Sequence, residues 1–277
     1  KPHIGTDILI DVVKNMRTEI INLGGDIRFN SQVTDFNIED DEISAVQVND
    51  DYWIETNKVV LAIGHSARDT FQMLLDHKVP MRSKAFAVGV RMEHPQTLIN
   101  ENQYGVNYPD SLPAAAYKLT RKVAEERGVY SFCMCPGGYV VNASSEEGMT
   151  AVNGMSYHAR AGENANSAMI ISVRPEDFGS DDALAGVEFQ RKLEKAAYRE
   201  GQGKIPVQLF GDFCKNRVSE QLGEIKPNTK GEWTFGNVRR IFPENFSAGL
   251  EEGIKGCEDL LPGFAREDAL LLSEESR

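Results

Sequence analysis

The sequence predicts a mixed α/β and α+β fold, in which part of an α/β domain with a β-meander precedes a mostly antiparallel β-sheet. Three observations carry this prediction. Apolar residues recur every three or four positions over residues 5–24, which is the period of an amphipathic helix. Short runs with a period of two follow, as expected for strands. The stretch Val59–Thr70 then has the composition of a buried strand that stops at Gly64 and leads into a second helix.

The first helix is expected to begin near Thr6, which can cap it, and to end at the glycine pair that follows Leu23. One short strand and a three-stranded meander should come next, because polar turns separate short runs of alternating character. The expected strands are residues 26–29, 32–38, 43–48 and 52–56.

The turn after the expected strand 59–63 is the first candidate site. Ser66 is placed to cap the next helix, and Asp69 stands three residues later as in a capping box. A helix N-terminus at the carboxyl edge of an α/β sheet presents N–H groups that favour phosphates. The alternatives are an ordinary turn with an exposed histidine, and an ion pair of Arg68 with Asp69 or Asp76. The candidate cofactor-binding residues here are Gly64, His65, Ser66 and Arg68.

A hinge is expected near residue 80, where Pro80–Lys84 follows the helix of residues 67–77. The strand-like segments after the hinge have no helices between them, which indicates an antiparallel sheet. These segments are residues 85–92, 115–119, 129–135, 139–142, 155–158 and 168–173.

Helices are expected at residues 182–199 and 244–260, the second ended by a Pro-Gly pair. The apolar triplet Leu270–Leu272 near the end has the look of a severed strand or helix. We therefore divide the chain into three parts: residues 1–82, an inserted domain of residues 83–243, and residues 244–277, whose helix returns toward the first part.

The run Phe132–Tyr139 is the most distinctive motif of the chain. Residues two apart on a strand point to one side, so Cys133 and Cys135 are expected to share a face and are the candidate catalytic thiols. A disulfide between them would close a strained ring. The alternatives are two small buried apolar side chains, or a metal site completed by His158.

A second set of polar residues follows the cysteines. The segment Asn153–Ser156 is expected to line the same cleft, and Arg160 lies in a polar loop suited to an acidic or amide-bearing substrate. Asn153, Ser156 and Arg160 are thus candidate substrate-binding residues. The alternatives are a plain Asn-Gly hairpin turn and an ordinary surface loop.

Composition narrows the class of protein. Hydrophobic residues make up 41% of the 277 residues and charged residues 26%, enough for a sizeable core. The net charge of −12 argues against nucleic acid as a partner, because phosphate binding needs a basic surface. Four irregularly spaced cysteines form no disulfide framework. With no apolar run near the roughly 20 residues of a membrane span, a cytoplasmic protein is expected.

Several motifs resemble known flavoproteins. The segments Gly24–Phe36 and Asn57–Thr70 are similar to the FAD domain of glutathione-reductase-like flavoproteins with two dinucleotide-binding domains. More narrowly, four motifs resemble a bacterial group of uncharacterised FAD-dependent dehydrogenases. These motifs are Lys1–Asp7, Gly64–Thr70, Phe132–Gly138 and Asn153–Ser156.

The resemblance implies a partial FAD-binding, Rossmann-like domain with an inserted substrate domain. It implies FAD as the cofactor, with Val33 near the adenine and with Gly137 and Gly138 against the flavin ring. The pyrophosphate loop Gly-x-Gly-x-x-Gly is missing from the sequence. The chain is therefore expected to be a portion of a longer protein that binds FAD more completely than the chain does alone.

The resulting hypothesis is the substrate-domain portion of an FAD-dependent oxidoreductase, which transfers hydride to or from an unknown small molecule. The alternatives are a non-catalytic flavin-binding or accessory module, and a fragment with no activity of its own. Strand edges left open near residues 59–63 favour association, so a homodimer is also expected.

Overall fold

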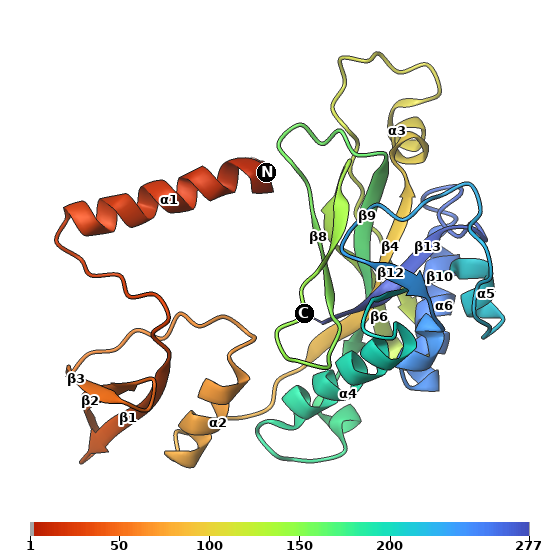
Figure 1. Ribbon diagram of the computed structural model, residues 1–277. Coiled ribbons are helices and arrows are strands. Elements are labelled where there is room, and N and C mark those ends of the chain that lie inside the picture. Colours follow the sequence, from red (N-terminus) through yellow and green to blue (C-terminus); the bar gives the residue numbers. More distant parts are fainter. Residues whose placement is uncertain (1–2, 277) are drawn as a thin grey trace.

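The computed structural model describes residues 3–276, which form two units joined by a linker (Figure 1). The N-terminal unit, residues 3–76, holds two helices and an antiparallel meander in the order β1-β2-β3. Its elements are α1 (Thr6–Asn22), β1 (Val33–Glu39), β2 (Glu42–Val48), β3 (Tyr52–Glu55) and α2 (Arg68–Asp76).

The sheet domain, residues 86–276, contains the remaining elements. Its strands are β4 (Phe86–Pro95), β5 (Thr120–Val123), β6 (Arg127–Cys135), β7 (Tyr139–Asn142), β8 (Val152–Met155), β9 (Asn164–Val173), β10 (Ile205–Leu209), β11 (Thr229–Lys230), β12 (Trp233–Phe235) and β13 (Leu270–Ser276). Its helices are α3 (Gln96–Tyr104), η1 (Ala124–Glu126), η2 (Pro175–Phe178), α4 (Ala185–Glu200), α5 (Phe210–Cys214), η3 (Val238–Ile241) and α6 (Glu244–Cys257).

The sheet domain has three layers. Its central layer is a seven-stranded sheet in the order β12-β10-β13-β4-β9-β6-β5, antiparallel except between β10 and β12. Helices α4 and α6 share the core on one face, where Phe189 packs edge-on against Phe246. A small sheet in the order β11-β7-β8 covers part of the other face.

The two faces of the central sheet differ in chemistry because strand side chains alternate. On β4, Val88, Val90 and Met92 enter the core beneath the helices. Arg91 and Glu93 have the opposite parity and are fully buried as well. A layer of buried charge therefore lies between the central sheet and the small sheet.

Much of the predicted secondary structure is confirmed. The first helix, the meander and the helices near residues 68, 185 and 244 form within a few residues of the expected positions. The mixed α+β class is confirmed too. Thr6 does not cap α1: Gly5 stands at the cap, and the Thr6 hydroxyl donates instead to the carbonyl of Ser156.

Two expected strands of the N-terminal unit are not formed. Residues 26–29 are irregular, and so is 59–63, whose Val60 is 91% exposed and Leu61 46% exposed. A strand is held by hydrogen bonds to neighbouring strands and by burial of its apolar side chains. No strand of residues 3–276 pairs with 59–63, so its β-branched composition is not enough to order it.

In the sheet domain one prediction is confirmed and another is wrong. The triplet Leu270–Leu272 forms a strand, one of its two expected alternatives: it starts β13, which lies between β10 and β4, and all three leucines are fully buried. Residues 115–119 pack in the core without ladder pairing. Residues 244–276 thus complete the seven-stranded sheet. A contact of this part with a flavin-binding domain stays a prediction.

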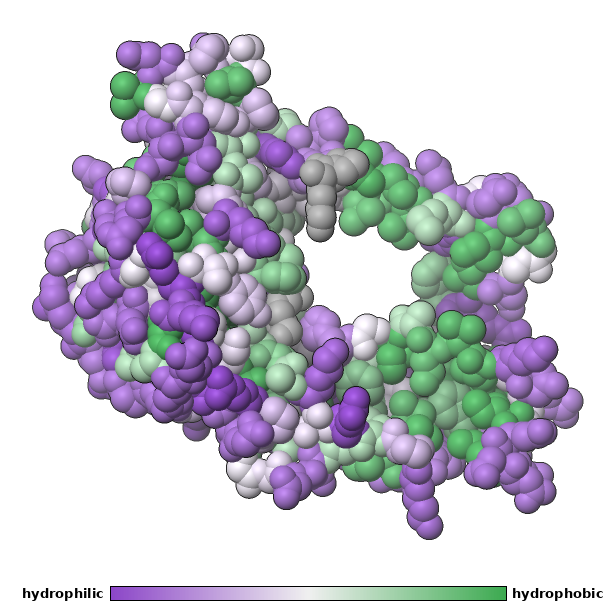
Figure 2. Space-filling view, turned by 180° about the vertical axis from the view of Figure 1, so that it is seen from behind, coloured by the Kyte–Doolittle hydropathy of each residue, from purple (hydrophilic) through white to green (hydrophobic). Residues whose placement is uncertain are grey.

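A wide opening lies between the N-terminal unit and the sheet domain, and apolar surface borders it (Figure 2). Helix α1 has 17 residues, none of them buried. The apolar side chains that the periodicity assigned to a packed face are instead exposed: Leu9, Val13, Met16, Ile20 and Leu23. Within residues 3–276, no helix is both long and apolar enough to cross a bilayer.

Candidate functional site

The buried guanidinium of Arg91 organises the region around the cysteine motif. Its Nε donates to Asn166 Oδ1 at 2.7 Å, and Nη1 donates to Glu275 at 2.9 Å. Its Nη2 reaches the Cys133 carbonyl at 2.5 Å and Cys135 Sγ at 3.2 Å. A fully buried arginine requires such partners, because an unpaired charge in the interior is very costly. Arg91 therefore fixes the end of β6 to β4, β9 and β13.

The two cysteines do not share a face as expected. Strand β6 has a bulge between Phe132 and Cys135, where three steps along β6 match two steps along β9. Cys133 takes a left-handed φ of 41° in this bulge. Cys133 is exposed, whereas Cys135 is half-buried beside Arg91. Burial raises the pKa of the Cys135 thiol above its ordinary value, despite the nearby guanidinium.

The first of two candidate pockets is a groove of about 430 Å³ between the start of α1 and the cysteine motif. It brings together Cys135, Ser156 and Arg160, three residues that the sequence marked as candidates. We call it the α1 groove, and its lining is His3, Ile4, Gly5, Thr6, Leu9, Met134, Cys135, Pro136, Gly154, Met155, Ser156 and Arg160.

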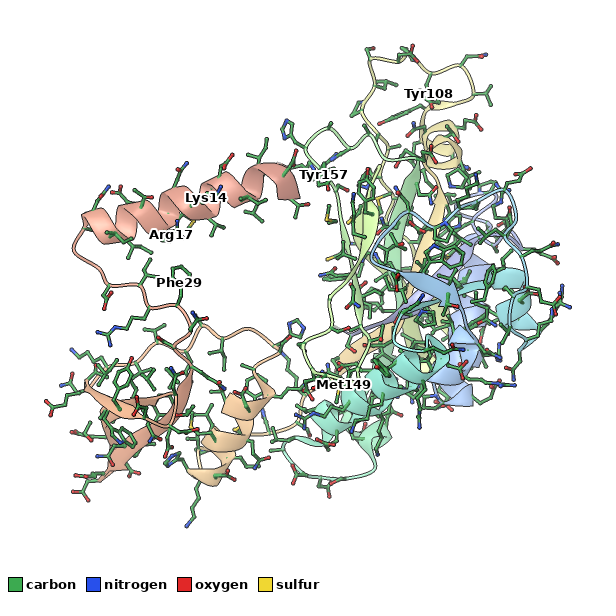
Figure 3. The ribbon with its side chains drawn as sticks, in the orientation of Figure 1. Lys14, Arg17, Phe29, Tyr108, Met149 and Tyr157 are labelled. Carbon is green, nitrogen blue, oxygen red and sulfur yellow. The ribbon has the colours of Figure 1, made fainter. Side chains whose placement is uncertain are left out.

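Hydrogen bonds between α1 and the segment after β8 hold the groove together. The Thr6 N–H donates to the carbonyl of Ser156 at 3.0 Å, and the His158 N–H donates to the Asp7 carboxylate at 2.8 Å. The ring of His158 bonds the carbonyl of Ile4. Tyr157 accordingly lies against the N-terminal end of α1 (Figure 3). Among residues 3–276, no three His, Cys, Asp or Glu side chains are grouped as metal ligands, so a site of the two cysteines with His158 is not formed.

Arg160 is the one cation of this groove that lacks partners within residues 3–276. Its Nε is buried and makes no hydrogen bond, and no carboxylate in the described part of the chain pairs with its guanidinium. The Ser156 hydroxyl, by contrast, donates to the Pro136 carbonyl at 2.8 Å.

The glycines after the cysteines meet the protein's own backbone. A Cβ at Gly137 would lie 1.8 Å from the Arg160 carbonyl oxygen, and one at Gly138 would lie 2.5 Å from that of Met155. Their N–H groups donate to Gln96 and to the Asn164 carbonyl. The two glycines therefore allow a close approach to the backbone of Arg160 and Met155, not to a flavin ring. The N–H groups of both glycines are already hydrogen-bonded within the protein.

The second pocket is a small cleft of about 80 Å³ next to residues 65–68. It groups the predicted residues His65, Ser66, Arg68 and Asn153 with buried carboxylates. We call it the His65 cleft, and its lining is His65, Ser66, Arg68, Ala143, Ser145, Ala151, Val152, Asn153, Gln190, Glu194, Glu274, Glu275 and Ser276.

Arg68 makes a different contact from those expected. Its guanidinium pairs with Glu194 of α4 and with Glu146, not with Asp69 or Asp76. Its terminal nitrogens are thus directed to protein carboxylates rather than to a phosphate. Its Nε is buried and has no hydrogen-bond partner in the described part of the chain, and the same holds for Oε1 of the fully buried Glu274. Burial raises the pKa of Glu274 well above its ordinary value.

Two other predicted positions, Gly64 and Val33, line neither pocket. Gly64 has a φ of 69° with open space around it, and Val33 is 38% exposed at the start of β1. Sequence reasoning missed Arg91, Glu194 and Glu274. A charged residue inside an apolar run, as Arg91 is within Ala85–Met92, was the available signal.

Similarity to known proteins extends over the whole chain. Residues 85–277 match the family described as "FAD-dependent protein, C-terminal domain-like". All of the chain aligns with an uncharacterized protein of Clostridium beijerinckii at 50% identity over 281 residues. The chain spans about half of that relative's length, 52%.

Proposed function

Because this chain belongs to the FAD-dependent protein, C-terminal domain-like family, we propose that it forms the substrate side of a flavoprotein oxidoreductase. In this proposal residues 1–82 belong to the flavin-binding part and residues from 83 onward form the substrate domain. FAD, when bound, supplies the hydride-transfer chemistry, and the protein supplies binding and orientation. The substrate occupies the α1 groove.

The observation that carries the proposal is the uncovered apolar surface of the N-terminal unit. Contacts of Thr6 and Asp7 fix α1 beside the groove, yet none of its residues is buried. Residues 59–63 have strand composition and no neighbouring strand within residues 3–276. Exposing this much apolar surface to water is unfavourable, so a partner that covers the surface stabilises the protein. We propose that the flavin-binding part of a longer protein covers both segments.

The residues present fit one edge of a flavin site. Two buried polar atoms of residues that line the His65 cleft, Arg68 Nε and Glu274 Oε1, have no partner within residues 3–276 and can meet polar groups of a bound cofactor. The N–H groups of Gly137 and Gly138 are already used, so they form no phosphate cradle. In this proposal His65 and Ser66 border the cofactor, and the flavin-binding part of the longer protein holds the pyrophosphate.

At the other end of the proposed site, Cys135 acts as a neutral group. Its raised pKa keeps the thiol protonated near pH 7, and the thiol donates to the Cys133 carbonyl. We therefore propose that Cys135 shapes the α1 groove and excludes water. It does not act as a nucleophile toward the substrate.

A flavin titration tests the proposal. We would titrate FAD into this chain and, in parallel, into the Clostridium beijerinckii relative, and follow flavin fluorescence. Quenching with the relative, and weaker or no quenching with this chain, is the expected result. Absence of binding by both proteins would overturn the flavoprotein assignment. Binding without turnover of any electron donor would favour the non-catalytic module.

Light scattering measures the oligomeric state and so tests whether a second copy of this chain covers the apolar surface of α1. A homodimer of this chain in solution, disrupted by Met16→Lys, would show that a second copy covers α1. A monomer that binds ANS at α1, with binding reduced by Met16→Lys, is expected when the cover belongs to a longer protein.

A further inference from the structure

We propose that the α1 groove binds the carboxylate of a small organic acid, and that Arg160 is the residue that receives it. The inference rests on the proposed function and deepens it by naming the substrate class. It starts from the charge balance of the groove. The lining contains Arg160 and no Asp or Glu side chain.

The guanidinium of Arg160 is available. Other arginines near the two pockets are neutralised: Arg91 pairs with Glu275, and Arg68 pairs with Glu194 and Glu146. Arg160 has no such pair within residues 3–276, and its Nε is buried without a hydrogen bond. A buried donor left unpaired is unfavourable, so an oxygen ligand that reaches it is favoured.

The backbone holds Arg160 in a strained position. Its φ of 49° is left-handed, a conformation that a side chain with a Cβ rarely adopts. The Arg160 N–H donates to the Tyr157 carbonyl, and the adjacent loop is tied to the Gly137 carbonyl through the N–H of Gly162. Strain of this kind persists where the surroundings enforce it, and it is concentrated at ligand sites.

The remainder of the lining sets the shape of the ligand. Ile4, Leu9, Met134 and Pro136 provide apolar surface around the cation. A guanidinium matches the two oxygens of a planar carboxylate in a bidentate contact. The helix N-terminus at the groove is already occupied, because the Asp7 carboxylate accepts N–H groups there, including that of His158. One cation beside an apolar wall is suited to a monoanion with a hydrocarbon body.

Methionine methyl NMR provides a direct test on the full chain. Met134 and Met155 line the groove, whereas Met149 lies by Arg68 and serves as a remote reference. Sodium benzoate is the probe, and benzamide is its neutral counterpart of similar shape. We expect saturable shifts of the Met134 and Met155 methyl signals with benzoate, and at least about tenfold weaker binding of benzamide. Equal binding of both, or binding of neither, would overturn the proposal.

Variants separate recognition from folding. Arg160→Gln should weaken benzoate binding about tenfold or more, and Arg160→Lys should restore part of it. The control Arg240→Gln removes the same charge from an exposed residue of η3 and should leave binding unchanged. Inorganic phosphate is the competing anion: phosphate that displaces benzoate would show a phosphate site instead.

The test of carboxylate binding is independent of whether the protein binds FAD. Benzoate binding is read from the methyl signals, and FAD binding is read from flavin fluorescence. Loss of benzoate binding in this chain with Arg160→Gln, together with FAD binding by the relative, is the expected combination. FAD binding by the relative together with benzoate binding that Arg160→Gln leaves unchanged would reject the carboxylate site alone.

Discussion

Arg68 and Glu194 form a buried bidentate ion pair that joins α2 to α4, although 126 residues separate them in sequence. Arg68 Nη1 donates to Glu194 Oε2 at 2.9 Å, and Nη2 donates to the other carboxylate oxygen. Both side chains are at most 6% exposed. The pair thereby links the N-terminal unit to the sheet domain beside the His65 cleft.

Removing one partner of this pair should be strongly destabilising. Glu194→Gln leaves the Arg68 charge buried with only Glu146 to balance it, so we expect a loss of about 3 kcal/mol in the free energy of unfolding. Urea denaturation measures it. Glu188→Gln is the matched control, since Glu188 lies on the same helix in an exposed pair with Arg191 and should cost less than about 0.5 kcal/mol. Equal stability of the two variants would show that the pair does not hold the units together.

Glu93 should make stability depend on pH. Burial raises its pKa to about 7, although the Asn228 N–H and Arg91 oppose the shift. The folded state then binds more protons than the unfolded state between about pH 4.5 and 7, so the contribution of Glu93 to stability falls as pH rises through this window.

Glu93→Gln tests this dependence because it removes the titration. Relative to the original chain, the variant should gain about 3 kcal/mol between pH 4.5 and pH 8. Thermal or urea unfolding at both pH values gives the difference, and the exposed Glu101→Gln serves as the control. A difference that is the same at both pH values would contradict the prediction.

Gly154 is required by the buried arginine. A Cβ at this position would lie 1.7 Å from Arg91 Nη2, and the guanidinium cannot move away because Asn166 and Glu275 hold it. Gly154→Ala should therefore lower the free energy of unfolding by about 2 kcal/mol. In Gly128→Ala the nearest atom is 3.6 Å away, so that control should change stability by less than about 0.5 kcal/mol. A neutral Gly154→Ala variant would show that Arg91 can shift.

The two cysteines of the motif should differ in reactivity. Cys133 is exposed on its bulge, whereas burial raises the pKa of Cys135 and removes part of its thiolate. At pH 8 we expect iodoacetamide to modify Cys133 at least about tenfold faster than Cys135. Mass spectrometry of the native chain and of Cys133→Ser measures the rates. Loss of the fast phase in Cys135→Ser, with its retention in Cys133→Ser, would reverse the assignment.

Local patterns predicted the elements that form from their own residues and near neighbours. The amphipathic period over residues 5–24 became α1, and the polar turns after residues 39 and 48 became the turns of the meander. Helix period and turn chemistry act over a few residues, so a sequence window contains them. The candidate residues Cys135, Ser156 and Arg160 were also found by motif and do meet in one groove.

Long-range contacts decided the rest. The leucines 270–272 became a central strand because β4 and β10 pair with them, whereas residues 59–63 have no pairing strand in the described part of the chain. The bulge at Cys133 depends on a register with β9 that no local pattern encodes.

The sequence by itself determined the mixed α+β class, the first helix with the meander after it, the helices near residues 68, 185 and 244, and the similarity to FAD-dependent proteins, because periodicity and motifs are properties of short windows. Only the tertiary structure decided which charges neutralise one another. It paired Arg68 with Glu194 and Arg91 with Glu275, and it left Arg160 unpaired among residues 3–276. Charge pairing acts through a few ångströms of space, and the residues concerned are far apart along the chain.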